Sequence, residues 1–161
     1  MNVEPEPAPA GDIAEIRTHA MVTKLGTIYY SHAAYIYSMK KISLYAMVVL
    51  YIAAGINHFW HPDFYLPIMP KWLPYHEVLV MLSGICEILF AFLLVFPSTR
   101  RFAAWCIILL LIAVFPANIQ MMFNYMNESN PKLWIAIIRL PLQIVLIWWA
   151  YGFTKKLKYL N

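Results

Sequence analysis

Four long apolar runs, separated by short polar turns, constrain this chain more than any other feature of its sequence. They cover about residues 42–59, 78–96, 102–123 and 133–153. An apolar helix of about 20 residues, rising about 1.5 Å per residue, crosses a hydrocarbon core about 30 Å thick. Backbone groups inside lipid must bond within their own segment, so each run is predicted to be a helix. The expected fold is an all-α bundle of four transmembrane helices.

The composition supports a membrane environment. Hydrophobic residue types make up 62% of the 161 residues and charged types make up 12%. A soluble domain is about half apolar and about a quarter charged. The lipid bilayer is therefore the expected solvent. The net charge of +4 is not interpreted as a nucleic-acid signal, because the basic residues flank the apolar runs. No nucleic-acid partner is expected.

The positions of Lys and Arg predict the orientation of the four spans. With four crossings, only Lys71 and Lys132 fall on one side, and Arg139 lies inside a span. The positive-inside rule places the more basic side in the cytoplasm, so both termini are predicted to be cytoplasmic. The more basic side holds nine of the 12 Lys and Arg residues: Arg17, Lys24, Lys40, Lys41, Arg100, Arg101, Lys155, Lys156 and Lys158.

Residues 1–38 differ from the membrane domain expected over residues 39–161. The segment "VEPEPAPAGD" is Pro-rich and acidic, which predicts disorder. Residues 12–38 mix charged, apolar and tyrosine side chains, which predicts an interfacial helix. Met39, followed by two lysines and an apolar run, also resembles the start of a membrane protein, so the role of residues 1–38 stays open. A cleaved signal peptide is not favoured, because the apolar run is long.

The stretch "GINHFWHPDFYLPIMPKWLP" follows the first span and concentrates prolines, aromatic rings and histidines. Prolines forbid a long helix there, and the rings suit the headgroup region of a bilayer. We expect an interfacial loop that lies as a lid over the outer side of the bundle. A metal site built from an HxxHxD pattern is not predicted, because such spacing is common by chance. The lid residues are Trp60, Phe64, Tyr65 and Trp72.

Each span also carries polar residues at similar depth. Glu87 is expected about 15 Å and Arg139 about 9 Å from the outer end of their spans. A charge in a span costs at least about 2.5–3.5 kcal/mol, so we predict that these two side chains form an ion pair. Amide and imidazole groups would satisfy the remaining donors and acceptors. They come from Asn57, His58, Asn118 and Gln143.

Two interpretations of this polar cluster stay open. In the first, the ion pair and the amides only fix which helices meet. In the second, they line a polar pocket that opens outward beneath the lid, because ionisable groups inside a span are candidates for function. Pro116 favours the second interpretation, since it frees a backbone carbonyl near Ile112 and can kink the third span.

The two cysteines suggest neither redox chemistry nor an intrinsic cofactor. Cys86 and Cys106 should lie about 10 Å apart along the membrane normal, whereas a disulfide needs Cα atoms within about 7 Å. They are predicted to be small apolar packing residues. The sequence contains no haem ligand pair, flavin fingerprint or iron–sulfur spacing.

Several motifs together resemble the DoxX-like family of small four-helix membrane proteins. They are "AGINHFWHPDFYLPIMP", "LSGICEI", "PSTRRFAAW", "AVFPANI" and "RLPLQ", within about residues 39–153. The resemblance implies a four-helix bundle in a bacterial inner membrane and an association with quinone-linked redox systems. The matching positions are Asn57, His58, Phe59, Pro62, Gly84, Glu87, Arg101, Pro116, Asn118, Arg139, Pro141 and Gln143.

Three functions compete on this basis. The first is an accessory or ligand-binding subunit without independent catalysis, whose pocket takes a lipophilic molecule such as a quinone, or a redox partner. The second is a subunit of a membrane oxidoreductase that passes electrons itself, with a cofactor from a partner. The third is a proton-coupled small transporter that uses Glu87 and His58. Four spans are few for a monomeric carrier, so the third would require a homo-oligomer.

Overall fold

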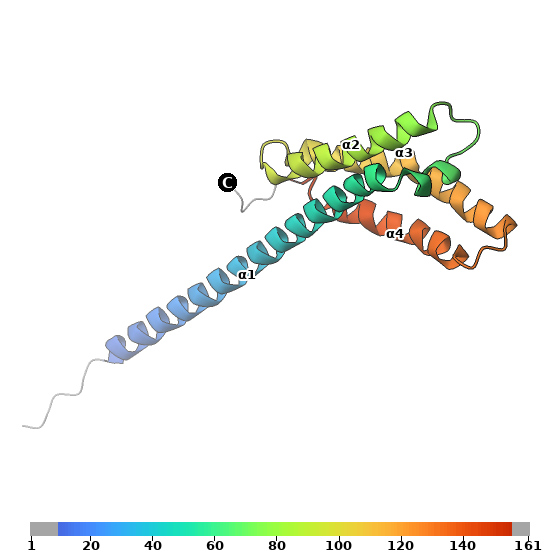
Figure 1. Cartoon of the computed structure of the whole chain (residues 1–161). Helices are drawn as coiled ribbons and strands as arrows, with labels where there is room; N and C mark the ends of the chain where they lie inside the picture. Colours follow the sequence, from blue (N-terminus) through green and yellow to red (C-terminus); the bar gives the residue numbers. More distant parts are fainter. Residues whose placement is uncertain (1–9, 156–161) are drawn as a thin grey trace, which may run out of the picture. The chain divides into compact units, whose positions relative to one another are not determined.

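The structure, a computed structural model, describes residues 10–155 and is built from helices alone over that range (Figure 1). It divides into two units between Ile42 and Ser43. Everything that forms the site belongs to the second unit. The four α-helices are α1 (Ala10–Trp60), α2 (His76–Val95), α3 (Arg100–Asn127) and α4 (Leu133–Tyr151), and two 3-10 helices, η1 (Pro62–Phe64) and η2 (Leu66–Ile68), follow α1.

All four α-helices are long and apolar enough to cross a membrane. This confirms the prediction of an all-α protein with four candidate spans. Two bounds differ from those expected. Helix α1 begins at Ala10 instead of near residue 42, and α3 continues to Asn127. Most of the segment predicted to be disordered, residues 1–9, lies outside the described residues. Placement of residues 12–38 at the membrane surface stays a prediction.

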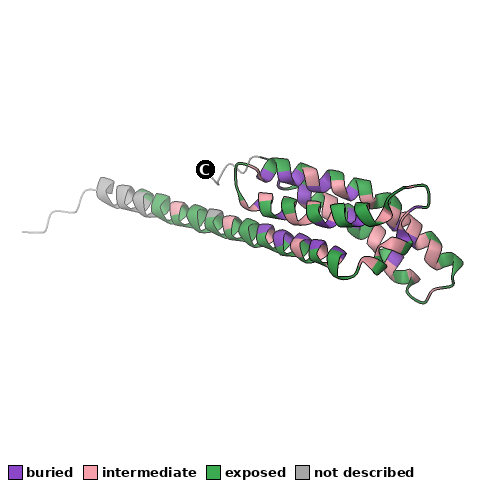
Figure 2. Cartoon of the chain, turned by 45° about the horizontal axis from the view of Figure 1, so that its top comes forward, coloured by how far each residue is buried: buried purple, intermediate pink, exposed green. Residues whose placement is uncertain are grey.

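The core of the second unit is a stripe of small and aliphatic side chains. On α1, Leu44, Met47, Val48 and Tyr51 are buried at intervals of three and four residues, which is the repeat of one helix face. Fully buried alanines let the neighbouring helices approach closely. Many of the exposed residues, green in Figure 2, are large and apolar, as expected where lipid replaces water. The buried alanines of this stripe are Ala91, Ala103, Ala104 and Ala150.

Helices α1 and α2 meet at two glycines. A Cβ atom added at Gly55 would lie 2.8 Å from the carbonyl oxygen of Gly84, and one added at Gly84 would lie 2.9 Å from the carbonyl oxygen of Gly55. Real Cβ atoms do not approach backbone so closely, so only glycine fits at either position. The contact sets the distance between the two helices at the level of the polar cluster.

The turn between α2 and α3 is fixed by side chains that bond the end of α2. Arg100 donates from Nε to the carbonyl oxygen of Leu94 at 3.0 Å and from Nη2 to that of Val95 at 3.0 Å. These are among the last carbonyls of α2, which have no partner within the helix. Arg101 donates from Nε to the carbonyl oxygen of Thr154 at 2.9 Å. Both arginines therefore also have a structural role.

The segment between α1 and α2 is folded against the bundle. Ile68 is buried with Met121 of α3 and Ala136 of α4, and Asn124 donates from Nδ2 to the carbonyl oxygen of Pro67 at 3.0 Å. The carbonyl oxygen of Pro70 can only accept, so His76 Nε2 donates to it at 3.1 Å. The segment between α1 and α2 is therefore anchored to α3 and α4 by these contacts.

Candidate functional site

A small polar cavity lies where α1, α2, α3 and α4 meet below the loop. Its volume is about 80 Å³, and residues from all four helices line it. Four of the six residues predicted to form the polar cluster are among them: His58, Glu87, Asn118 and Arg139. The structure therefore brings together charged and amide groups that are far apart in the sequence.

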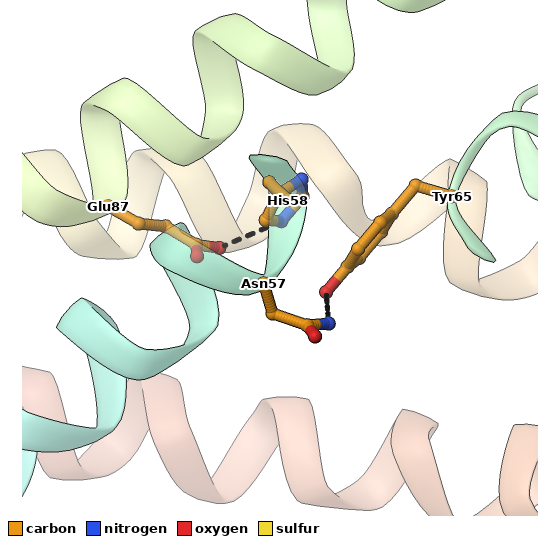
Figure 3. A network of polar contacts seen from close by, with 4 residues as sticks. All are labelled: Asn57, His58, Tyr65 and Glu87. Carbon is orange, nitrogen blue, oxygen red and sulfur yellow. Dashed lines mark hydrogen bonds and ion pairs between the residues drawn. The ribbon is translucent and has the colours of Figure 1, made fainter. Parts of the chain in front are cut away.

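Glu87 faces His58 and not Arg139. His58 Nε2 lies 3.6 Å from Glu87 Oε1, and the two side chains are 10% and 14% exposed (Figure 3). Within the described residues, no ion pair joins Glu87 to Arg139, so the predicted contact is wrong. The reason is the glycine contact, which brings the His58 turn of α1 against the Glu87 turn of α2. Arg139 lines the same cavity from α4 without reaching the carboxyl group.

The loop closes over the histidine through one tyrosine. The rings of His58 and Tyr65 stack with centroids 3.8 Å apart and planes 16° apart. Asn57 donates from Nδ2 to the hydroxyl oxygen of Tyr65 at 2.7 Å (Figure 3). Of the four predicted lid residues, Tyr65 is therefore part of the cavity wall. The other three are exposed: Trp60 by 78%, Phe64 by 49% and Trp72 by 74%. Their place at the membrane surface stays a prediction.

The two predicted amides on α3 and α4 bond to each other. Asn118 donates from Nδ2 to Gln143 Oε1 at 2.8 Å, and both side chains are buried. Gln143 Nε2 donates to the carbonyl oxygen of Leu111 on α3. This carbonyl lies one residue before that of Ile112, which loses its helix donor because residue 116 is a proline. Gln143 therefore links α4 to α3 at the proline and does not satisfy a Glu87–Arg139 pair.

Several polar atoms at the site lack a partner. In the described part of the chain, Tyr51 Oη, His58 Nδ1 and Glu87 Oε2 are buried without a hydrogen bond. Over the same residues, the Arg139 guanidinium forms neither a hydrogen bond nor an ion pair. Buried polar groups in proteins are almost always bonded, often to ordered water. The cavity has room for several water molecules or for a small polar group of a ligand.

The side chains that line this cavity can form hydrogen bonds to a ligand head group that both donates and accepts them. One wall carries a carboxyl group and an imidazole, and Arg139 supplies a guanidinium. Among the described side chains, no three His, Cys, Asp or Glu residues come together to hold a metal ion. Cys86 and Cys106 are both free thiols, as predicted.

Sequence reasoning did not assign Ser83 to the site, although it lines the cavity one turn before Glu87. It also missed Tyr51, which lies in the core two turns before His58 with its hydroxyl group buried. A repeated spacing could have identified the correct ion pair. Gly55 precedes His58 by three residues, and Gly84 precedes Glu87 by three residues. Two helices that pack at these glycines must present the histidine and the glutamate to each other.

Comparison with known proteins identifies a family but no activity. The comparison with curated proteins gives no match, and neither does the comparison with solved structures. The model of one family, described as a domain of unknown function (DUF8561), matches residues 47–154. The matched range contains α2, α3, α4, the part of α1 from Met47 onward and every residue of the cavity. The chain therefore belongs to the DUF8561 family.

Proposed function

We propose that this protein is a multi-pass protein of a bacterial inner membrane that binds a small lipophilic molecule and has no catalytic activity of its own. The single observation that carries the proposal is the polar cavity inside the bundle, with the unbonded Oε2 atom of Glu87 and an Arg139 side chain that lacks an ion pair within the described residues. Packing alone does not require such groups. A helix pair can be held by small residues, as it is at Gly55 and Gly84.

The proposed orientation places both termini in the cytoplasm and the cavity in the outer half of the bundle. It is supported by the excess of Lys and Arg at the α2–α3 turn and at the two chain ends. The exposed rings of Trp60 and Trp72, at the opposite end of the helices, suit the outer headgroup region. A ligand would enter beneath the segment that carries Tyr65.

The resemblance to the DoxX-like family suggests a quinone or a membrane redox partner as the occupant. The cavity suits a quinone carbonyl in one respect, because the Arg139 guanidinium can donate hydrogen bonds to it. No cofactor is assigned to the chain itself. In this proposal the protein acts as an accessory subunit that presents or stores the lipophilic molecule.

Mild detergent purification, followed by mass spectrometry of copurified lipids and proteins, tests this proposal. We expect a defined lipophilic molecule with the wild-type protein and loss of most of it with Arg139→Ala. Lys132→Ala is the matched control, because Lys132 is exposed and lies outside the cavity. Equal recovery from wild type and Arg139→Ala, or recovery of nothing from either, would contradict ligand binding in the cavity.

A second candidate function, proton-coupled transport, is favoured by the His58–Glu87 pair. Two ionisable side chains that face each other from neighbouring membrane spans are typical of proton relays. Proton flux into liposomes that contain the wild-type protein and Glu87→Gln would separate the two functions. Flux that is present in the wild type and abolished in Glu87→Gln supports transport, whereas equal flux in both eliminates it.

A further inference from the structure

A second, larger cavity adjoins the polar one. Its volume is about 280 Å³, and it lies between α2, α3 and the end of the loop. The volume is close to the lower end of the range of ligand pockets, about 300–1,000 Å³. Five residues line both cavities, so they form the boundary between the two spaces. They are Met69, Leu79, Ser83, Val114 and Ala117, which include two small side chains and one flexible methionine.

The larger cavity suits a hydrocarbon tail. Its lining is almost wholly aliphatic, with Leu73, Leu82 and Leu110 among its walls. Leu82 and Ala113 are exposed on the surface of the helices. This surface faces lipid when α2 and α3 cross a membrane. A molecule could therefore reach the cavity from the hydrocarbon phase without passing through water.

The polar cavity suits a head group that both donates and accepts hydrogen bonds. Glu87 Oε2 is buried without a partner, and Arg139, which lines the same cavity, lies beyond ion-pair distance of the carboxyl group. A group between them must accept from the guanidinium and donate to the carboxyl group. A hydroxyl group can do both. An ether or a ketone leaves the glutamate unbonded, which is costly for a buried group.

An anionic head group fits this cavity less well. A ligand carboxylate or phosphate near Arg139 would place a second negative charge in the same small cavity as Glu87. Repulsion between like charges is strong where water is scarce, because the effective dielectric constant is low. The carboxyl group on α2 therefore selects against lipophilic acids.

We infer that the two cavities hold one neutral amphiphile, with its hydroxyl group between Glu87 and Arg139 and its alkyl tail between α2 and α3. The inference rests on the proposed ligand-binding function. It adds the class of ligand, which is a lipophilic alcohol or phenol, and it adds which end of the ligand each cavity holds. Ser83, at the boundary, is placed to bond to the same hydroxyl group.

Photolabelling of the full chain in lipid nanodiscs tests this inference. Three probes share one diazirine-bearing alkyl chain and end in a hydroxyl group, a methyl ether or a carboxylic acid. Peptide mapping should find the alcohol on the α2 and α3 segments that line the larger cavity, about tenfold more than the ether or the acid. A difference of about tenfold corresponds to one hydrogen bond to a charged group.

Two variants sharpen the test. Glu87→Gln keeps a hydrogen-bond acceptor but removes the charge, so labelling by the acid should rise about tenfold and labelling by the alcohol should fall, because its bond to a charged acceptor is lost. Glu128→Gln, at an exposed position at the end of α3, is its control and should leave labelling by all three probes unchanged.

Ala113→Phe fills the larger cavity from an exposed position and should abolish labelling. Ala53→Phe, which is exposed on α1 and outside both cavities, should not.

The outcomes separate this inference from the proposed function. Equal labelling by the three probes, or a preference for the acid in the wild type, overturns the hydroxyl head group but leaves a lipophilic ligand in place. Wild-type labelling no stronger than that of Ala113→Phe overturns the ligand itself and with it the proposed function. Labelling by the acid that is unchanged in Glu87→Gln shows that the carboxyl group does not select the head group.

Discussion

At the scale of single residues, the set of polar groups inside the bundle was predictable, but their partners were not. A charged or amide side chain stands out in an apolar run, which is how Glu87, Asn118 and Gln143 were found. Counting residues along a helix gives the depth of a side chain but not the direction in which it points. The structure supplies that direction: Glu87 faces His58 and not Arg139, and the amides of Asn118 and Gln143 bond to each other.

A substitution at Gln143 measures the bond between α3 and α4. Gln143→Leu leaves the buried Asn118 amide without its acceptor and removes the second donor to the Leu111 carbonyl oxygen. We expect the free energy of unfolding to fall by about 1–3 kcal/mol. The measurement is SDS-driven unfolding of the protein in mixed micelles. Gln120→Leu is the control, because the Gln120 amide bonds only within α3, to Asn124, and it should cost less than half as much.

The contact between Asn57 and Tyr65 can be tested without disturbing the ring stack. Tyr65→Phe keeps the ring against His58 but removes the hydroxyl group that accepts from Asn57. We expect a loss of about 1 kcal/mol in unfolding free energy, and a larger loss for Tyr65→Ala, which also removes the stacked ring. Equal effects of the two substitutions would show that the ring does not hold the loop on the histidine.

At the scale of helices, run length predicted the number and approximate position of the four candidate spans. Bounds were less predictable where polar residues continue a helix beyond its apolar part. Helix α3 extends to Asn127 through residues such as Gln120 and Asn124, whose side chains bond one turn apart. The packing of η2 on α3 was not predicted either. It depends on a buried isoleucine and one side-chain hydrogen bond, and neither produces a periodic pattern.

Glycine substitutions test the contact between α1 and α2. Gly84→Ala places a methyl group 2.8 Å from His58 Cβ and 2.9 Å from a backbone oxygen, so the helices must separate, at a cost of about 1–3 kcal/mol. The same change at Gly26, where nothing lies within 4 Å, should be neutral or stabilising by up to about 1 kcal/mol. SDS-driven unfolding measures both. Gly84→Ala with wild-type stability would contradict the close contact.

At the scale of the whole molecule, the four apolar helices indicate a membrane protein but do not set its orientation. The distribution of Lys and Arg is a bias in composition, and no contact within the bundle depends on which end faces the cytoplasm. The proposed entry of a ligand beneath the Tyr65 segment does depend on it. Orientation therefore decides from which side of the membrane a partner could reach the cavity.

Cysteine labelling in intact cells determines that orientation. The two native thiols are first replaced by serine, and single cysteines are then introduced at two exposed positions, Ser98→Cys in the α2–α3 turn and Glu128→Cys at the end of α3. A membrane-impermeant maleimide should label Glu128→Cys in intact cells and Ser98→Cys only after the inner membrane is permeabilised, because the positive-inside rule places the Arg100–Arg101 turn in the cytoplasm. The opposite pattern would invert the proposed topology, and it would place the Tyr65 segment and the access to the cavity on the cytoplasmic side.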